Sequence, residues 1–396
     1  MAVDAALRIP PRPEMVLGEG TVDSLPELVR RLGGDAAFVI TDRGLVDAGV
    51  AGLVAGRLEA AGLRTAVHDG VGTNPCAADV LAGSAALRSF GRCVIVAVGG
   101  GSPIDAAKAI ALHAANDQRT PDQPSCRVPT VAGVDPRGLE ALEHGVAGLA
   151  PAGPLIAVPT TAGTGTETNE FAVIDDHAAR RKRYVGHPSA LPRFAVLDPA
   201  LSITAPPRVT AACGIDVLAH AIESLQARTG NAYSAALGLE AVRLVVAHLP
   251  AVVANPGDRA GRSAMLLAAH LAGLAFATTG LGTAHAIGHA LSARYGTPHG
   301  VALAAVLPLV VRFNAGERRD ATARIAEAAG AAHGGAPDAV TALQERSGLH
   351  PTLRELGVER HELPALADAA LADQVVDNAP RVPTRRELVT LLDVAF

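Results

Sequence analysis

Short apolar runs alternate with helical patterns through the first half of the chain. Four apolar runs predict strands, at residues 36–41, 64–68, 92–98 and 155–158. Two stretches between them predict helices, at residues 46–61 and 78–90. Strands that alternate with helices build a parallel sheet with right-handed crossovers. The near-continuous hydrophobicity from Cys93 to Val98 is typical of a strand covered on both faces.

The pattern becomes helical from about Ser202 onward. The predicted helices lie at residues 208–227, 232–253, 261–278, 299–313 and 317–332. Between residues 116 and 154 the composition shifts to Pro, Gly, Asp and Gln, which indicates a long loop or an insertion. A chain of 396 residues exceeds the usual size of a single core. We therefore predict an α/β domain over residues 1–200, with a parallel Rossmann-like sheet, and an all-α domain over residues 201–396.

Composition and charge restrict the functional class. With 49% hydrophobic and 18% charged residues, the chain has the profile of a globular protein. The net charge of −5 argues against a nucleic-acid or anionic-membrane partner. The N-terminus lacks a secretory signal pattern, and no uninterrupted apolar run reaches membrane-spanning length. The four cysteines have no paired spacing, so we expect a soluble protein of the reducing cytoplasm; they are Cys76, Cys93, Cys126 and Cys213.

Lysine is almost absent from the chain. Of its 34 basic residues only Lys108 and Lys182 are lysines, and the rest are arginines. A lysine kept against this bias marks either a position that needs a compact ammonium or a chance survivor.

The segment from Gly99 to Lys108 follows a predicted buried strand and opens a helix. Its glycines allow positive φ and a close approach of the backbone to a ligand, and Pro103 suits the first helical position. Free N–H groups at the start of a helix bind anions, most readily a pyrophosphate. The alternative is a tight turn with a structural role only.

A second loop, rich in Gly and Thr, follows the strand at residues 155–158. Its hydroxyl groups, on Thr160, Thr161 and Thr164 among others, suit phosphate or ribose oxygens. Two such loops at the carboxyl ends of strands predict a dinucleotide across that edge of the sheet. Asp42 also ends a strand, where its carboxylate either binds an adenosine ribose, favouring NAD over NADP, or caps the following turn.

One aspartate and four histidines carry the clearest chemical signal. Asp216 and His220 are four residues apart on a predicted helix, and His285 and His289 repeat this spacing. His299 follows in a loop that enters the next helix. One carboxylate and three imidazoles complete a site for a divalent metal, with one imidazole left over. Ligation by N and O without thiolate suits Fe²⁺ or Zn²⁺, and the residues do not decide between them.

These segments together resemble the iron-containing (group III) alcohol dehydrogenase family, whose architecture is like that of dehydroquinate synthase. The resemblance covers essentially the whole chain. Its blocks are Leu17–Gly20, Thr41–Asp42, Asn74–Pro75, Gly99–Lys108, Pro159–Glu167, Gly214–Glu223 and Gly280–Gly300. The last two blocks are highly specific.

The resemblance implies a role for each candidate residue. The metal ligands would be Asp216, His220, His285 and His299. His289 would be a non-ligand histidine beside the nicotinamide. The cofactor would be held by Asp42, Asn74, Gly99, Gly100, Ser102, Asp105, Thr160, Thr161, Thr164 and Lys182. Phe276 and Val376, with Val375 as the alternative to Val376, would line the substrate pocket.

The chain also departs from the family pattern. The segment from Asn116 to Gly153 is longer than usual, and Thr166-Glu-Thr168 is more polar than the common Ser-Glu-Val. Both departures bear on the pocket entrance and on the choice of substrate.

The resulting hypothesis is a metal-dependent NAD(P)-linked alcohol dehydrogenase that acts as an aldehyde reductase on a small alcohol or aldehyde, and we expect a homodimer. The metal acts as a Lewis acid on the alcohol oxygen, hydride passes to the nicotinamide, and His289 relays the proton. NAD(H) and Fe²⁺ are the expected cofactors, with NADP(H) and Zn²⁺ as alternatives. The rival interpretations are a glycerol-dehydrogenase-like or dehydroquinate-synthase-like zinc enzyme on the same fold, and a binding protein without catalysis.

Overall fold

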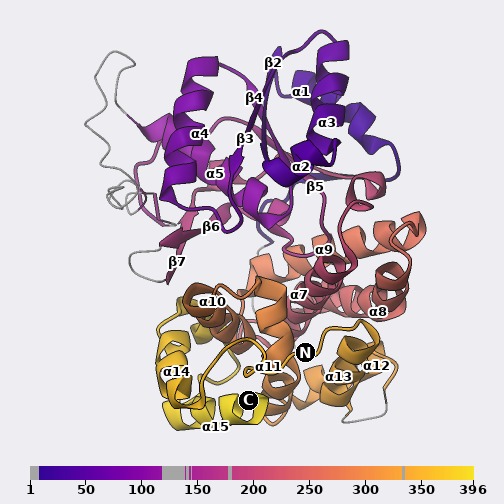
Figure 1. Ribbon diagram of the computed structural model, residues 1–396, viewed down its shortest axis with the longest axis vertical. Helices are drawn as coiled ribbons and strands as arrows, with labels where there is room; N and C mark the ends of the chain where they lie inside the picture. The colour runs from indigo at the N-terminus through magenta and orange to yellow at the C-terminus, as the bar shows by residue number, and fades with distance from the viewer. Residues whose placement is uncertain (1–8, 118–138, 140–141, 144, 177–180, 332–334) are drawn as a thin grey trace. The chain divides into compact units, whose positions relative to one another are not determined.

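The computed structural model describes residues 9–117, 139, 142–143, 145–176, 181–331 and 335–396 (Figure 1). Contacts divide the chain into two compact units. The α/β unit contains Arg12–Thr160 and Thr166–Leu201, and the helical unit contains Thr161–Gly165 and Ser202–Phe396. The expected insertion at 116–153 falls largely outside the described residues, although Leu139 and Leu142 pack in the core of the α/β unit.

The α/β unit is built on a six-stranded sheet in which every pairing is parallel. In spatial order its strands are β1 (Glu14–Leu17), β8 (Phe194–Leu197), β5 (Leu155–Pro159), β4 (Val94–Gly99), β2 (Ala36–Asp42) and β3 (Arg64–Val71). The predicted fold class, a parallel α/β domain followed by a helical region, is confirmed. The short strands β1, at one edge of the sheet, and β8, beside it, have no counterpart among the predicted strands.

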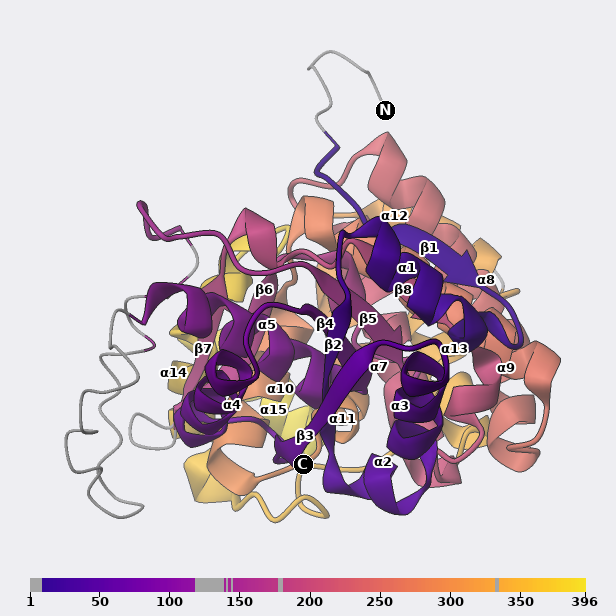
Figure 2. The same cartoon turned by 90° about the horizontal axis from the view of Figure 1, so that it is seen from above.

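Helices cover both faces of this sheet (Figure 2). They are α1 (Leu25–Arg31), α2 (Arg43–Asp47), α3 (Val50–Ala60), α4 (Ala77–Phe90) and α5 (Gly101–Asn116). Alternate residues of each strand point to opposite faces, so Ile95 and Ala97 pack in the core with α4 and α5. Val94 and Val96 pack in the other core, with α1 and α3. Burial on both faces explains why these strands are continuously apolar.

The predicted helix over residues 46–61 is wrong in one respect, because the structure divides it into α2 and α3. Gly49 separates the two, with a φ of 79°, in the left-handed region that favours glycine. The sequence pattern also missed an antiparallel hairpin of β6 (Phe171–Asp176) and β7 (Arg181–Gly186). Charged residues dominate the turn end of this hairpin, at the end of β6 and the start of β7, which hides its alternating pattern.

The helices of the helical unit are α7 (Pro207–Gln226), α8 (Ala232–Ala254), α9 (Arg259–Thr279), α10 (Thr283–Tyr295), α11 (His299–Asn314), α12 (Arg319–Ala328), α13 (Ala336–Arg346), α14 (Leu363–Leu371) and α15 (Arg385–Ala395). Three of them, α7, α8 and α9, pack against one another, and α11 packs against α7 and α10. A 3₁₀ turn, η6 (Gln374–Asn378), contacts α10. In this unit the bounds of α7, α8, α9 and α11 follow the predicted ones within about two residues. The fifth predicted helix, over residues 317–332, is shorter in the structure, where α12 covers Arg319–Ala328, and no bounds were predicted for α10, α13, α14 and α15.

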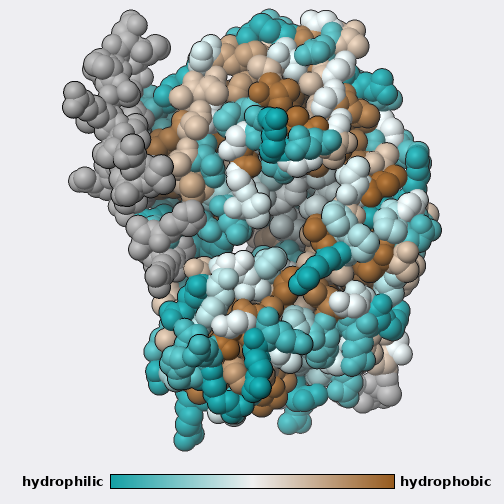
Figure 3. Space-filling view, in the orientation of Figure 1, coloured by the Kyte–Doolittle hydropathy of each residue, from teal (hydrophilic) through white to brown (hydrophobic). Residues whose placement is uncertain are grey.

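Two described helices, α8 and α9, have the length and apolar composition of membrane spans. The core helices of globular proteins pass the same test, and 61% of the α9 window is buried inside its unit. Two charged residues, Glu240 and Arg243, interrupt the apolar sequence of α8. On the face shown in Figure 3, hydrophobic and hydrophilic residues are interspersed over both units. The two helices are therefore weak evidence for a membrane location.

Candidate metal centre and cofactor loops

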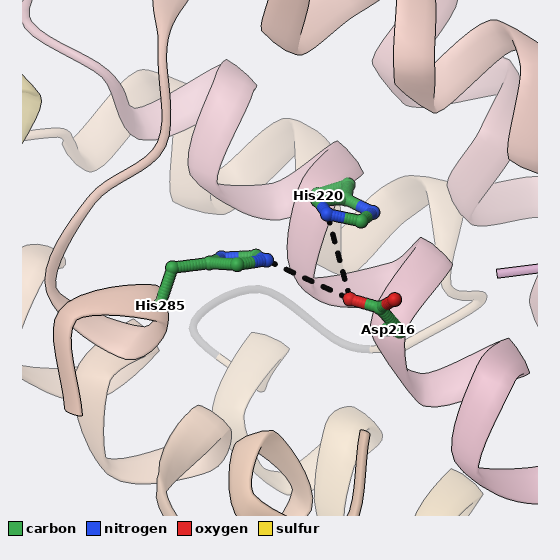
Figure 4. Close-up of side chains that lie close together, drawn as sticks. All are labelled: Asp216, His220 and His285. Atoms are coloured by element: carbon green, nitrogen blue, oxygen red, sulfur yellow. Dashed lines mark ion pairs between the residues drawn. The ribbon is translucent and has the colours of Figure 1, made fainter. Parts of the chain in front are cut away.

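Three buried side chains of the helical unit converge on one point (Figure 4). Asp216 and His220 project from the same face of α7, one turn apart, and His285 projects toward them from α10. One potential ligand atom from each lies within 4.8 Å of the others. All three residues are buried.

His299, the first residue of α11, completes the group. Its Nε2 lies 3.6 Å from Oδ1 of Asp216, and the Nε2 atoms of His220 and His285 lie 3.4 and 3.6 Å from the same oxygen. Asp216 Oδ1 and His285 Nε2 are buried with no hydrogen-bond partner among the described residues. Buried polar atoms are rarely left without a partner. A divalent cation fits this arrangement, in which three nitrogens and one carboxylate oxygen converge without hydrogen bonds to one another.

The electrostatics of the cluster differ from one proposed ligand to the next: they favour an ionised Asp216 and a neutral His220 but a charged His285. Burial raises the pKa of Asp216, but the facing imidazoles of His220 and His299 lower it more, so its pKa lies well below the ordinary range. Burial lowers the pKa of His220 to about 4, which keeps its imidazole neutral. Burial also lowers the pKa of His285, but the Glu223 carboxylate outweighs it and raises the pKa to about 9.

Glu223 is the functional residue that the sequence interpretation left without a role. Its Oε2 lies 2.6 Å from Nδ1 of His285, and its two oxygens accept hydrogen bonds from the backbone N–H groups of Gly282 and Ala284. A carboxylate only accepts, so Glu223 holds a proton on Nδ1 of His285, and a cation would be bound through Nε2 after that nitrogen has released its own proton. The available signal was its spacing, because Glu223 stands seven residues after Asp216 on α7 and so shares its face.

His289 lies beside this cluster on α10. Its ring centroid is 5.9 Å from that of His285 and 5.3 Å from that of His299. Its Nδ1 lies 2.8 Å from Oδ2 of Asp373, whose other oxygen accepts the N–H of Val375 at the start of η6. Asp373 therefore fixes both the ring of His289 and the segment that follows.

The two predicted pocket residues also belong to the helical unit. The Phe276 ring stacks on His220 with centroids 4.6 Å apart. Val376 is buried in η6, the turn that contacts α10.

The carboxyl ends of three adjacent strands bring several predicted cofactor residues to one edge of the sheet. β2, β4 and β5 are neighbours and end at Asp42, Gly99 and Pro159. β2 continues to β3 on one side, whereas β4 and β5 lie on the other. Open parallel sheets bind ligands at such a reversal of strand order.

Gly99 and Gly100 form the turn from β4 into α5. Gly99 has a φ of 153°, and a Cβ there would lie 2.4 Å from Cγ of Pro103, so only glycine fits. Ser102 Oγ accepts the N–H of Asn74, which has the positive φ of 57° that Asn tolerates. Asn74 and Ser102 thus lie together beside the turn.

The other predicted cofactor residues have definite partners within the chain. Asp42 caps α2 by accepting the N–H of Leu45 through Oδ1, which is the capping role given above as the alternative to ribose binding. Lys182 on β7 pairs with Asp175 on β6. The Asp105 carboxylate accepts the Thr166 hydroxyl and the N–H of Val173. A contact of each residue with the cofactor stays a prediction.

The Gly/Thr loop begins in the α/β unit, where the N–H of Thr160 donates to the carbonyl of Gly99. Thr161 and Thr164 lie in the segment that packs with the helical unit. There a Cβ on Gly163 would lie 2.9 Å from Cβ of Cys213, and one on Gly165 would lie 2.8 Å from Cα of Gly273. The loop is therefore closely packed along its length.

Comparison with known proteins gives matches over both halves of the chain. The family model described as iron-containing alcohol dehydrogenase matches residues 11–199. The model described as Fe-containing alcohol dehydrogenase family, C-terminal, matches residues 210–396. The lactaldehyde reductase of Escherichia coli (strain K12) is 37% identical over 388 residues, which cover 96% of this chain and 97% of that protein.

Solved structures are also similar to this chain over nearly its whole length. A 1,3-propanediol oxidoreductase superposes with a TM-score of 0.87 at 31% identity, over 99% of this chain and 100% of its own. The sulfoacetaldehyde reductase from Bifidobacterium kashiwanohense, solved in complex with NAD⁺, superposes with a TM-score of 0.85 at 26% identity, over 99% of each chain.

Proposed function

The chain belongs to the iron-containing alcohol dehydrogenase family and is an NAD-linked alcohol oxidoreductase; from this premise we propose that Asp216, His220, His285 and His299 hold its catalytic metal and that it reduces short aldehydes. The family membership favours a dehydrogenase over the dehydroquinate-synthase-like enzyme and over a binding protein without catalysis.

One observation carries the proposal. Three imidazole Nε2 atoms surround a single oxygen of Asp216 at 3.4 to 3.6 Å, although that oxygen has no hydrogen-bond partner among the described residues. A structural cluster would gain stability by closing these contacts into hydrogen bonds. The spacing is what a cation between the four atoms requires, and the family description favours iron for it.

When bound, a divalent metal acts as a Lewis acid toward the oxygen of the alcohol or aldehyde. Asp216 supplies the anionic ligand, and its depressed pKa keeps it ionised across the physiological range. Glu223 holds His285 in the tautomer whose Nε2 faces the site.

We assign the proton transfer to His289. Because Asp373 accepts from Nδ1, the nitrogen that exchanges a proton with the substrate oxygen, directly or through water, is Nε2. The turn of Gly99 and Gly100 and the hydroxyl groups of Thr160, Thr161 and Thr164 orient the dinucleotide for hydride transfer.

For the substrate we propose a short aldehyde, including hydroxyaldehydes. The E. coli relative is a lactaldehyde reductase, and two similar structures are a 1,3-propanediol oxidoreductase and a sulfoacetaldehyde reductase. Phe276 and Val376 supply apolar walls beside the predicted metal ligands. Walls of this kind suit a short carbon chain better than an extended one.

The test is an NADH-oxidation assay with lactaldehyde, propanal, 3-hydroxypropanal and sulfoacetaldehyde. The protein is assayed after chelation and again after reconstitution with Fe²⁺ or Zn²⁺, with NADPH in parallel. We expect turnover of short aldehydes with NADH that disappears on chelation and returns with one of the metals. Unchanged turnover in the chelated protein would refute the metal role.

We further propose that the enzyme works in the cytoplasm as a homodimer. The three described cysteines, Cys76, Cys93 and Cys213, form no disulfide, which suits a reducing compartment. Sedimentation of the purified protein tests the homodimer, since a monomer would contradict it.

A further inference from the structure

Lys108, one of the two lysines of the chain, is buried in the α/β unit and has no part in the chemistry proposed above. Its side chain is 1% exposed. The ammonium donates to both the carbonyl and the hydroxyl oxygen of Thr166 at 2.6 Å. It also donates to the carbonyl of Phe171 at 2.8 Å and to Oδ1 of Asn169 at 3.1 Å.

All four of these oxygens belong to the segment that follows the Gly/Thr loop. Asp105, one turn earlier on α5, accepts the hydroxyl of Thr166 and the N–H of Val173. Two side chains of one helix thus hold the chain where it leaves the loop. At the other end of the loop, the N–H of Thr160 donates to the carbonyl of Gly99.

The helix that holds the end of the second loop also begins at the first. α5 starts at Gly101, directly after the turn of Gly99 and Gly100. Lys108 therefore links the position of Thr166 to the phosphate-binding end of its own helix.

A compact ammonium suits this position and a guanidinium does not. The four oxygens surround Nζ, whereas the donors of arginine lie in one plane and project farther from the backbone. Burial lowers the pKa of Lys108 to about 8, although Asp105, Glu167 and Glu170 oppose the shift. Desolvation of this charge lowers the stability of the fold, so stability alone does not account for a lysine here.

We propose that Lys108 is a positioning residue for the cofactor: by fixing Thr166, it sets the conformation of the loop that carries Thr160, Thr161 and Thr164, and so determines the affinity for the dinucleotide. This inference rests on the proposed function, in which that loop binds NAD(H). The metal ligands lie in the other unit, so metal content is independent of Lys108.

The experiment compares the wild type with Lys108→Arg and Thr166→Val. NADH binding is followed by fluorescence titration, KM and kcat are measured with a short aldehyde, and bound metal is measured by mass spectrometry. We expect Lys108→Arg to raise the Kd and KM for NADH at least about 10-fold, with kcat at saturating NADH and metal content retained. Thr166→Val is nearly isosteric and removes one acceptor of the ammonium, so it gives a smaller rise and decides the matter if the arginine variant does not fold.

The matched control is Ile110→Ala, which opens a cavity on the same helix. Ile110 is fully buried, its side chain packs toward Gly83 of α4, and it accepts none of the four bonds of the ammonium described above. This variant should unfold at a lower temperature yet keep its Kd for NADH within about twofold of the wild type. Wild-type affinity in both Lys108→Arg and Thr166→Val, or an equal loss in Ile110→Ala, would overturn the inference. A wild type that does not bind NADH would refute the proposed function instead.

Discussion

The two units present their functional groups in different ways. In the helical unit the chemistry resides in buried side chains, with Asp216, His220 and His285 within 4.8 Å of one another. In the α/β unit we expect it to reside mainly in the backbone of turns at strand ends, such as the turn of Gly99 and Gly100 between β4 and α5. Side-chain sites depend on residue identity and spacing, whereas backbone sites depend on conformation. A side-chain site should therefore lose its ligand when one ligating atom is removed, and a backbone site when the path of the chain changes.

The largest effect is expected from the side-chain site. His285→Ala removes one proposed ligand and the donor from which Glu223 accepts, so bound metal should be lost and kcat should fall by more than about 10³-fold. Elemental analysis with the NADH-oxidation assay measures both. NADH binding, which we assign to the α/β unit, should survive. A metal-free variant that turns over at the wild-type rate would rule out a catalytic role for the side-chain site of the helical unit.

A pH effect on stability follows from the buried ammonium of the α/β unit. Burial lowers the pKa of Lys108 from 10.5 to about 8. Between these values the unfolded chain holds a proton that the folded chain has released, so the free energy of unfolding rises with pH across this window. The rise is about 3 kcal/mol and should be missing in Lys108→Met. Urea unfolding of both proteins from pH 7.5 to 10.5 measures this rise. If the free energies of unfolding of the two proteins changed equally with pH, the lowered pKa of Lys108 would be contradicted.

Glu223→Gln tests how far the metal centre depends on a residue beyond its ligands. Glutamine keeps the size of the side chain but has one acceptor atom, so it cannot satisfy His285, Gly282 and Ala284 together. Metal affinity should fall about 10- to 100-fold. Competition with a chromophoric chelator measures this loss. An unchanged affinity would mean that the Nδ1 bond of His285 has no influence on the site.

Two glycine substitutions sharpen the backbone side of the comparison. Gly99→Ala forces a side chain against Pro103 at a φ of 153°, which should raise the Kd for NADH about 10-fold and leave metal content intact. Gly56→Ala is the control, because this glycine of α3 has open space around its Cβ position. It should leave binding unchanged and stabilise the fold by about 0.5–1 kcal/mol. Equal NADH affinity in the two variants would show that the turn does not bind the cofactor.

The same contrast explains what the sequence could predict. Strands buried on both faces and long helices leave strong patterns, so the fold class and most of their bounds could be predicted. The ligand set could be proposed because Asp and His at helical spacing are informative, and the structure brings all four side chains together. Glu223 was left without a role because its function depends on a bond to His285, 62 residues away.

Local conformation was harder to anticipate. The break between α2 and α3 at Gly49 depends on one left-handed residue inside a helical pattern. The β6–β7 hairpin carries Lys182 and Arg183 on a strand, against the usual preference for apolar residues there. The role of Lys108 needed the position of Thr166, which lies 58 residues away in the sequence.

We propose that four residues bind the metal and that His289 does not. This proposal is tested most directly by anomalous diffraction from crystals of the protein reconstituted with Fe²⁺ under anaerobic conditions. The account predicts one anomalous peak, coordinated by a carboxylate oxygen of Asp216 and the Nε2 atoms of His220, His285 and His299, with His289 still bonded to Asp373. A peak coordinated by His289, or one that lies away from Asp216, would contradict it.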